Sequence, residues 1–588
     1  MSTKTQKIDP FVRKKEERLS GADDQGLSRA GVSALRWRRF CALSGGLFYS
    51  FTYHWGRQLD RNGNVNFKNL SGWMWILVTA AVVTVLLDRA FAWLEGRAAK
   101  RNSAKKNSAP AADSTGRKEP GCRGLLQGAV GLFLAWTPVF LAVFPGFFAY
   151  DATDELQEVL TGQYVTRHPL LHVLMLGKTV SGIGKMTGRY NLGIAVYVLL
   201  QMAVMALLLS WVLEKVRKLG APRWLARVCA LFLAFFPVIP MYVLCTSKDI
   251  VYTAGMLAAM VLLAGMAGRE SGQERSAFLW PALALSLFVM AVFRNNGFYV
   301  LLVMVPVLLL LAGKGRLKKM LFVLAFVLAA RAGLNAALNA ALQPVSTDSM
   351  ETLTVPIQQL ARTWKYSPEL FDETDQETLF EILPGEVLAR YNPKLSDMVK
   401  IDFQTQNYEK NPGKYQALWL KMGLKAPFTY VNAWFMTSYG FWYPFTVIDV
   451  YNGNRYYAES SYFSCETESP GWQNSFFPAL QKVYQEISWG DSVHRIPVIS
   501  WLFSPGFLCW VYVFALLYFL SQKRWRSIGV MAPAYLNWLT VLLGPTYLVR
   551  YVLIFWFALP LLLTQLLSID GQVCYTPKDN GKSGTVCP

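Results

Sequence analysis

Three acidic residues, Asp151, Asp154 and Glu155, lie within five residues of one another and directly follow a long apolar run. A carboxylate at this position can act as a general base toward a hydroxyl, or can bind a divalent cation (Mg²⁺ or Mn²⁺) that steadies a phosphate leaving group. Asp151 comes at once after the apolar residues FPGFFAY, so we rank it slightly ahead of Asp154. The alternative is an amphipathic surface helix whose solvated face carries Asp154, Glu155 and Glu158.

Two histidines, His168 and His172, follow at the i, i+4 spacing of one helix face. Such a pair can bind a metal ion or donate hydrogen bonds to a phosphate. Of the two, we take His168, together with Asp151, as a possible metal ligand. Pro169 suits the start of a helix, so a structural role for both histidines at a helix end stays open.

A second group of polar residues lies at those ends of the apolar runs that face the outer side of the membrane. Lys and Arg are usually depleted on that side. Burying a charge in lipid costs roughly 2.5–3.5 kcal/mol on insertion scales, so several cations together need a reason. Their simplest shared use is to bind an anion, because Arg grips phosphate oxygens with two N–H groups. Singly, an Arg can also snorkel to water, and Lys248 can simply pair with Asp249. The candidates for substrate binding are Lys248, Asp249, Arg294, Asn295, Asn296, Arg331 and Arg550.

Aromatic residues concentrate at 434–443, where Trp442 and Tyr443 are candidates for stacking on a sugar or an isoprenoid chain. An aromatic belt at the membrane interface predicts the same composition. Both interpretations stay open.

The elements that position these residues are helices in a membrane. The chain has 588 residues, of which 53% are hydrophobic and 16% charged, and this composition excludes an ordinary soluble domain. A membrane-spanning helix needs about 20 mainly apolar residues. We therefore expect an all-α polytopic membrane protein with about 12 transmembrane helices and a small, mainly α extracytoplasmic domain. The runs are 38–55, 72–93, 124–148, 191–213, 224–246, 249–268, 277–293, 297–313, 320–342, 497–520, 527–543 and 551–568.

The net charge of +20 comes from Lys and Arg crowded into alternate loops, which is the positive-inside pattern rather than a nucleic-acid surface. This pattern places both termini in the cytoplasm, and 149–190 and 343–496 outside. The segment 427–447 is apolar, but a span there would put Lys523, Arg524 and Arg526 outside, so we expect an interfacial or re-entrant segment. The expected parts are a basic tail 1–37, two helices in 38–93, a disordered basic linker 94–123, a transmembrane core 124–342, an extracytoplasmic domain 343–496, C-terminal helices 497–568 and a cytoplasmic tail 569–588.

Several of these motifs together resemble the GT-C class of membrane glycosyltransferases. They are FPG…YDATDE, RHPLLH, SKD and RNNG, and they cover roughly 124–313. The element His168-Pro169-Leu170-Leu171 is similar to the HPPL-like element of that class, with one of its two prolines missing. The resemblance is closer to a group of poorly characterised bacterial multi-pass proteins with a YPG…D…Q…HP loop and an RNNG segment. Asp151, Gln157, His168 and Arg294 match this pattern.

The resemblance implies an inverting glycosyltransferase in a bacterial cytoplasmic membrane, with its active site on the outer face. Its donor would be a polyprenyl-phosphate sugar, and its acceptor an extracytoplasmic cell-wall polymer, glycan, lipid or protein. Asp151 would be the base or metal ligand, and Asp154 and Glu155 are its rivals because they form the literal Asp-Glu pair. The alternatives are a polysaccharide or lipid transporter or flippase, whose charges would line a path, and an O-antigen-type polymerase or ligase.

Overall fold

The computed structural model describes residues 10–107, 122–267, 278–346, 348–448, 450, 467–490 and 492–567. The predicted cytoplasmic tail 569–588 and the middle of the predicted linker, 108–121, lie outside these residues. The structure is 79% helical, and no strand occurs among the residues it describes. The protein is thus all-α, as the apolar runs predict.

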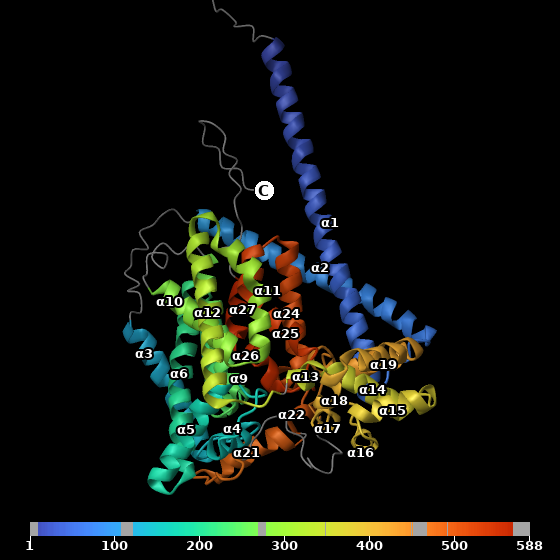
Figure 1. The fold of residues 1–588 in the computed structure, drawn as a ribbon. Coiled ribbons are helices and arrows are strands. Elements are labelled where there is room, and N and C mark those ends of the chain that lie inside the picture. Colours follow the sequence, from blue (N-terminus) through green and yellow to red (C-terminus); the bar gives the residue numbers. More distant parts are fainter. Residues whose placement is uncertain are drawn as a thin grey trace, which may run out of the picture.

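Upright helices form the centre of the molecule (Figure 1). They are α6 (Tyr190–Lys218), α9 (Lys248–Ala267), α10 (Leu279–Val292), α11 (Asn295–Ala312), α12 (Leu317–Leu342, preceded by η2, Lys314–Arg316), α24 (Pro505–Ser521) and α25 (Trp525–Val541). At the edge of this bundle lies the slanted helix α3 (Cys122–Ala142) (Figure 1). Six helices of the described residues are long and apolar enough to cross a membrane, namely Leu70–Ala98, Arg123–Ala142, Tyr190–Lys218, Lys248–Ala267, Asn295–Ala312 and Lys314–Leu342. Composition and helix length therefore agree on a membrane protein, and about twelve spans stays a prediction.

Three of the predicted spans are broken, and one of them, 497–520, divides at Ser504 into α23 (Ile499–Phe503) and α24. The run 224–246 forms α7 (Arg223–Phe235) and the short α8 (Val238–Val243), and Pro237 lies at the break. The run 551–568 forms η5 (Val549–Val552), α26 (Ile554–Phe557) and α27 (Leu559–Leu567). Pro237 has no N–H to continue the helical hydrogen bonds. The break in 551–568 begins with η5, which brings Arg550 beside Asp151 and Asp249.

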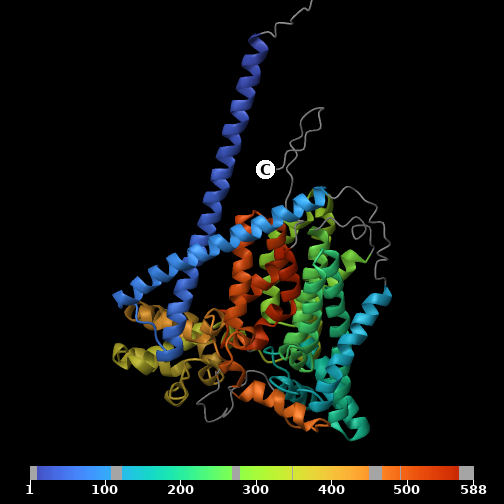
Figure 2. The same cartoon turned by 180° about the vertical axis from the view of Figure 1, so that it is seen from behind.

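The first two helices are longer than the sequence suggests. Figures 1 and 2 show α1 (Pro10–Asn62) projecting far beyond the bundle, and α2 (Leu70–Asn107) crossing it obliquely. Residues 94–107, expected to be disordered, continue α2 because Ala, Lys and Arg are strong helix formers. Arg38 of α1 donates to Asp88 and Glu95 of α2, each at 2.8 Å. This polar contact ties the two helices together.

The segment 348–438 folds around a hydrophobic core of its own, which includes Ile357, Leu379 and Met422. Its helices are α13 (Asp348–Thr352), α14 (Thr354–Tyr366), η3 (Pro368–Leu370), α15 (Glu373–Ile382), α16 (Gly385–Leu388), α17 (Asp397–Lys400), α18 (Thr405–Lys410), α19 (Pro412–Lys425) and α20 (Pro427–Ser438). With only 12 residues, α20 is too short to cross a membrane. The apolar segment 427–447 ends in η4 (Tyr439–Phe441) and is no membrane-crossing helix.

The predicted first outer loop forms α4 (Ala152–Thr161) and α5 (Leu170–Thr187), with Pro169 at the N-cap of α5. Both lie at the same end of the bundle as α13–α19 and α21 (Pro478–Trp489), as the two views agree. The short helices α22 (Ser492–Arg495) and α23 (Ile499–Phe503) lead back to α24. The two segments predicted to lie outside thus share one end of the molecule.

Candidate functional site

The loop before α4 is held against the loop before α9. The N–H of Phe147 donates to the carbonyl oxygen of Leu244, and the N–H of Thr246 donates to that of Phe147, both at 3.0 Å. This pairing places the two chain segments side by side, so the residues that follow them, at the starts of α4 and α9, come close together. It brings Asp151 beside Lys248, although 97 positions separate them in the sequence.

Alternating charges run on from this pair. Asp151 Oδ2 lies 2.9 Å from Lys248 Nζ and 3.2 Å from Arg550 Nη1. Arg550 Nε lies 3.7 Å from Asp249 Oδ2, and the other oxygen of Asp249 pairs with Arg294. At the far end, Glu155 Oε1 lies 3.8 Å from Lys248 Nζ. We call this row the charge ladder; its members in order are Glu155, Lys248, Asp151, Arg550, Asp249 and Arg294.

The ladder has a buried side and an accessible side. The side chains of Glu155 and Asp249 are 1% exposed, whereas Asp151 is 28% exposed. The three cations lie between, at 11–17%. The three carboxylates and three cations of the ladder sum to zero charge, and Asp151 is the most exposed of the six. An anion can therefore reach Lys248 and Arg550 only in competition with the carboxylate of Asp151.

Asp151 is ionised in this setting. Burial alone would raise the pKa of its carboxyl group, but the charges of Arg550 and Lys248 outweigh burial and hold this pKa well below its usual range. The carboxylate is thus bound by cations and is a weak base until something else attracts them.

Aromatic rings fix the two arginines. The guanidinium of Arg550 lies 4.5 Å from the ring centroid of Tyr150, whose hydroxyl is 3.2 Å from that of Tyr242. Arg294 lies 4.5 Å from the ring of Tyr551. Tyr150 has a φ of 62°, a left-handed conformation that costs a non-glycine residue roughly 1–2 kcal/mol. This strain is located directly before Asp151, where it turns the chain into α4.

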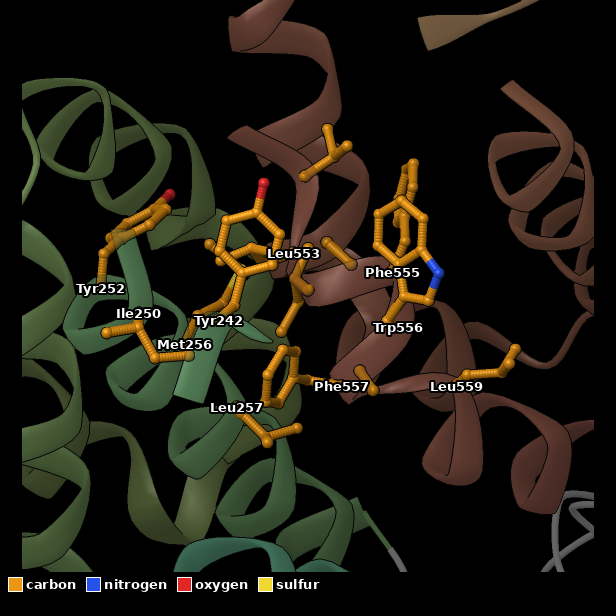
Figure 3. Close-up of a cluster of buried hydrophobic side chains, with 14 of the residues drawn as sticks. Tyr242, Ile250, Tyr252, Met256, Leu257, Leu553, Phe555, Trp556, Phe557 and Leu559 are labelled. Carbon is orange, nitrogen blue, oxygen red and sulfur yellow. The ribbon is translucent and has the colours of Figure 1, made fainter. Parts of the chain in front are cut away.

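A buried asparagine joins α9, which begins at Lys248, to η5, which carries Arg550. Asn537 of α25 accepts from Tyr252 Oη at 2.9 Å and donates to the carbonyl oxygen of Tyr551 at 3.0 Å. It is 1% exposed, so these bonds exchange with no solvent. Behind it, side chains of α9 and of residues 553–557 pack together in a buried apolar cluster (Figure 3). This packing holds η5, and thus Arg550, against the start of α9.

The acidic helix is not the surface helix of the alternative interpretation. Of its carboxylates, Asp154 is 60% exposed and pairs with Arg167 at 2.8 Å. Glu155 and Glu158 are buried, because α4 packs on α5 and each meets a histidine. Glu155 Oε2 lies 2.5 Å from His172 Nδ1, and Glu158 Oε1 lies 2.6 Å from His168 Nδ1. Glu155 and Glu158 lie three residues apart on α4, and His168 and His172 lie four residues apart across the start of α5, so each glutamate meets one histidine.

His168 has both ring nitrogens occupied, since its Nε2 accepts from Arg167 at 3.3 Å. Burial lowers its pKa more than the bond with Glu158 raises it, so the ring is neutral at pH 7. In the described part of the chain, no three or more His, Cys, Asp or Glu side chains form a group able to hold a metal ion. With cations around Asp151 and partners on His168, these side chains do not fit a cation site by themselves.

Other predicted residues lie apart from the ladder. Arg331 donates to the carbonyl oxygen of Ala291 at the end of α10 and covers the ring of Phe298. Asn295 is exposed at the start of α11. Asn296 donates to Thr540 at 3.0 Å and to Asn537, the asparagine that bonds Tyr252 and Tyr551, at 3.4 Å. Trp442 and Tyr443 are buried near α1 and α24, where they pack against other rings.

The glycine of RNNG has a packing role. A Cβ at Gly297 would lie 2.1 Å from the carbonyl oxygen of Met290 and 2.6 Å from the ring of Tyr252. Only glycine allows α11 to start this close to α10 and α9, and the turn carries Arg294.

Sequence reasoning missed one carboxylate. Glu468 lies in the predicted outer domain, yet its N–H donates to the carbonyl oxygen of Phe148 and its Oε2 accepts from Thr153 at 2.8 Å. Burial raises the pKa of Glu468, beyond what the bond with Thr153 lowers, and Asp154 and Asp151 raise it further. No motif around residue 468 indicates this contact.

The fold and the ladder together define an all-α membrane protein with a charged, partly accessible site at one end of its bundle. The chain belongs to the family of unknown function DUF6020, whose model matches residues 159–570. The match includes Lys248, Asp249, Arg294 and Arg550, and begins after Asp151. No curated protein and no solved structure matches the chain.

Proposed function

We propose that this protein is a membrane glycosyltransferase that moves a sugar from a polyprenyl-phosphate donor to an extracytoplasmic acceptor. The observation that carries the proposal is the ladder, in which the reachable carboxylate of Asp151 lies between two cations. Such a donor needs a cationic site for its phosphate beside a base for the acceptor hydroxyl. It also needs a lipid bilayer, and the apolar helices fit that environment. The proposed address is a bacterial cytoplasmic membrane, with the ladder facing outward.

In the proposed reaction the acceptor oxygen attacks the anomeric carbon, and the bond from that carbon to the phosphate oxygen breaks. The proton of the acceptor hydroxyl passes to Asp151, and the electron pair leaves with polyprenyl phosphate. Attack opposite the leaving group inverts the anomeric centre. Lys248, Arg550 and Arg294 offset the charge that develops on the phosphate.

The depressed pKa of Asp151 fits this scheme if the donor itself activates the base. A phosphate drawn to Lys248 and Arg550 weakens their hold on the carboxylate, and its own negative charge raises the pKa of Asp151. The base thereby gains strength only when a donor is bound.

The test is donor turnover by the full chain in lipid nanodiscs. A panel of polyprenyl-phosphate sugars is offered with and without Mg²⁺ or Mn²⁺, and released polyprenyl phosphate is measured. We expect release by wild type and a loss of about a hundredfold or more in Asp151→Asn, the range of general-base catalysis. Asp154→Asn decides between the rival carboxylates, and its exposure predicts near-normal turnover. Asp402→Asn is the matched control, because Asp402 is an exposed carboxylate that pairs with Arg390 in the segment 348–438, away from the ladder.

The opposite result is equally informative. If no donor in the panel releases polyprenyl phosphate, and the protein instead moves a lipid-linked substrate across vesicles, the chain is a transporter or flippase. Release that depends on a second lipid-linked glycan as acceptor identifies a polymerase or ligase.

A further inference from the structure

Behind Lys248, the ladder continues into the protein interior as a row of hydrogen bonds. Glu155 Oε2 meets His172 Nδ1 at 2.5 Å, and His172 Nε2 meets Tyr197 Oη at 3.0 Å. These residues come from α4, α5 and α6 and are 1%, 0% and 6% exposed. We call Glu155, His172 and Tyr197 the relay. None of them reaches the accessible side of the ladder, so the relay acts on a ligand only through Lys248.

The directions of these bonds follow from donor and acceptor chemistry. The Nδ1 of His172 faces Glu155 Oε2, and its Nε2 faces the hydroxyl of Tyr197. In the tautomer with the proton on Nδ1, the ring donates to the carboxylate and its Nε2 accepts from the hydroxyl of Tyr197. Tyr197 thereby selects the tautomer that satisfies Glu155. The relay leaves the other oxygen of Glu155 for Lys248, at 3.8 Å.

The distances indicate what this arrangement does for Lys248. Its Nζ lies 2.9 Å from Asp151 and farther, 3.8 Å, from Glu155, so Glu155 supplies a counter-charge without drawing the amine inward. Without the N–H of His172, the buried carboxylate of Glu155 keeps only Lys248 as a charged partner. Lys248 Nζ would then move toward Glu155, because a buried carboxylate without a hydrogen-bond donor is costly. The amine would then leave the accessible side of the ladder.

We propose that the relay is a positioning device that keeps Lys248 on the accessible side of the ladder, where it binds the phosphate of a polyprenyl phosphate. This proposal rests on the phosphate-binding part of the proposed function and not on glycosyl transfer itself. His172 and Tyr197 are positioning residues, because neither touches the ligand.

Histidine 172 offers a matched pair of variants. An asparagine amide places its N–H₂ near the position of Nδ1, whereas a glutamine amide places it near Nε2. His172→Asn therefore keeps the donor to Glu155, and His172→Gln and His172→Ala lose it. If His172 had only a structural role, the loss of affinity in each of the three variants would follow the decrease in its thermal midpoint.

The experiment measures the Kd for a fluorescent polyprenyl phosphate with the full chain in nanodiscs, alongside the thermal midpoint. We expect His172→Ala and His172→Gln to bind about tenfold more weakly, as for the loss of one charge-assisted hydrogen bond. His172→Asn should stay within about threefold of wild type. Tyr197→Phe should weaken binding in wild type but have no effect in the His172→Asn background, since the amide has no nitrogen at Nε2.

Unchanged or tighter binding by His172→Ala overturns the proposal, as does equal weakening by the asparagine and glutamine variants. Wild type that does not bind polyprenyl phosphate overturns it as well. Donor turnover, measured in parallel, separates the two proposals. Binding with the expected pattern but without turnover of any donor leaves the relay and refutes the glycosyltransferase, whereas turnover without the pattern does the reverse.

Discussion

Arg550 is the residue whose replacement tests the ladder most sharply, because it contacts two carboxylates through different nitrogens. Its Nη1 lies 3.2 Å from Asp151 and its Nε 3.7 Å from Asp249. Lysine keeps the positive charge but has a single nitrogen, so Arg550→Lys can satisfy only one of the two. The variant therefore removes one contact while conserving charge.

The size of the effect follows from the longer contact. At an effective dielectric constant of about 20, unit charges at that separation attract by roughly 4–5 kcal/mol before desolvation is subtracted. A lysine that stays with Asp151 loses only the longer ion pair, whereas one that moves to Asp249 loses the hydrogen bond with Asp151, so the net loss should be at most that of one charge-assisted hydrogen bond, about 1.5–3 kcal/mol. We expect kcat/KM for the donor to fall in Arg550→Lys by up to about a hundredfold. Arg550→Met, which also removes the contact with Asp151, should lose about a further tenfold or more.

The assay is release of polyprenyl phosphate at substrate concentrations below KM, with the thermal midpoint recorded for each variant. Arg390→Lys is the matched control, since its exposed pair with Asp402 lies outside the ladder. Arg550→Lys at wild-type rates would refute the two-carboxylate bridge. Equal loss of kcat/KM in the lysine and methionine variants would show that a positive charge without the guanidinium geometry contributes nothing to donor turnover.

Three further predictions concern how the ladder is built. Asn537→Leu strands the hydroxyl of Tyr252 and the carbonyl oxygen of Tyr551, so it should destabilise the protein by roughly 1–3 kcal/mol per group; an unchanged thermal midpoint contradicts this. Gly297→Ala should lower the thermal midpoint and weaken polyprenyl phosphate binding, because the added carbon meets the backbone of Met290; normal binding would show that the turn can relax. Because the folded-state pKa of Asp151 lies below the ordinary value of about 3.9, its stabilisation is complete above that pH and is lost only as pH falls through the lowered folded value. The difference in thermal midpoint between wild type and Asp151→Asn should thus stay constant from about pH 8 to 5, and a difference that disappears in this window refutes the assignment.

Part of this architecture is readable from the sequence. Apolar runs locate the long helices of the bundle. The runs cannot reveal where a helix breaks, as at Pro237, or that α2 continues to Asn107, because both depend on local backbone energies within an otherwise suitable composition.

The site shows the same division. Asp151 and Arg550 were both candidates, but nothing local pairs residues so far apart in the chain. Their positions near the ends of apolar runs make Arg294 and Arg331 equally good candidates for anion binding. Only the packing of the helices distinguishes them, because it places the guanidinium of Arg331 against the end of α10. The pairing of Glu155 and Glu158 with His172 and His168 was the one contact that spacing could have predicted, once two adjacent antiparallel helices are assumed.

The ladder draws its members from four distant stretches of the chain, and Arg550 belongs to the last. During synthesis from the N-terminus, Asp151 and Asp249 emerge long before their common partner. A chain released before residue 550 would hold every earlier helix yet keep two carboxylates without this partner at the membrane. The ladder therefore reaches equal numbers of carboxylates and cations only after residue 550 has been added, and without Arg550 its carboxylates outnumber its cations by one.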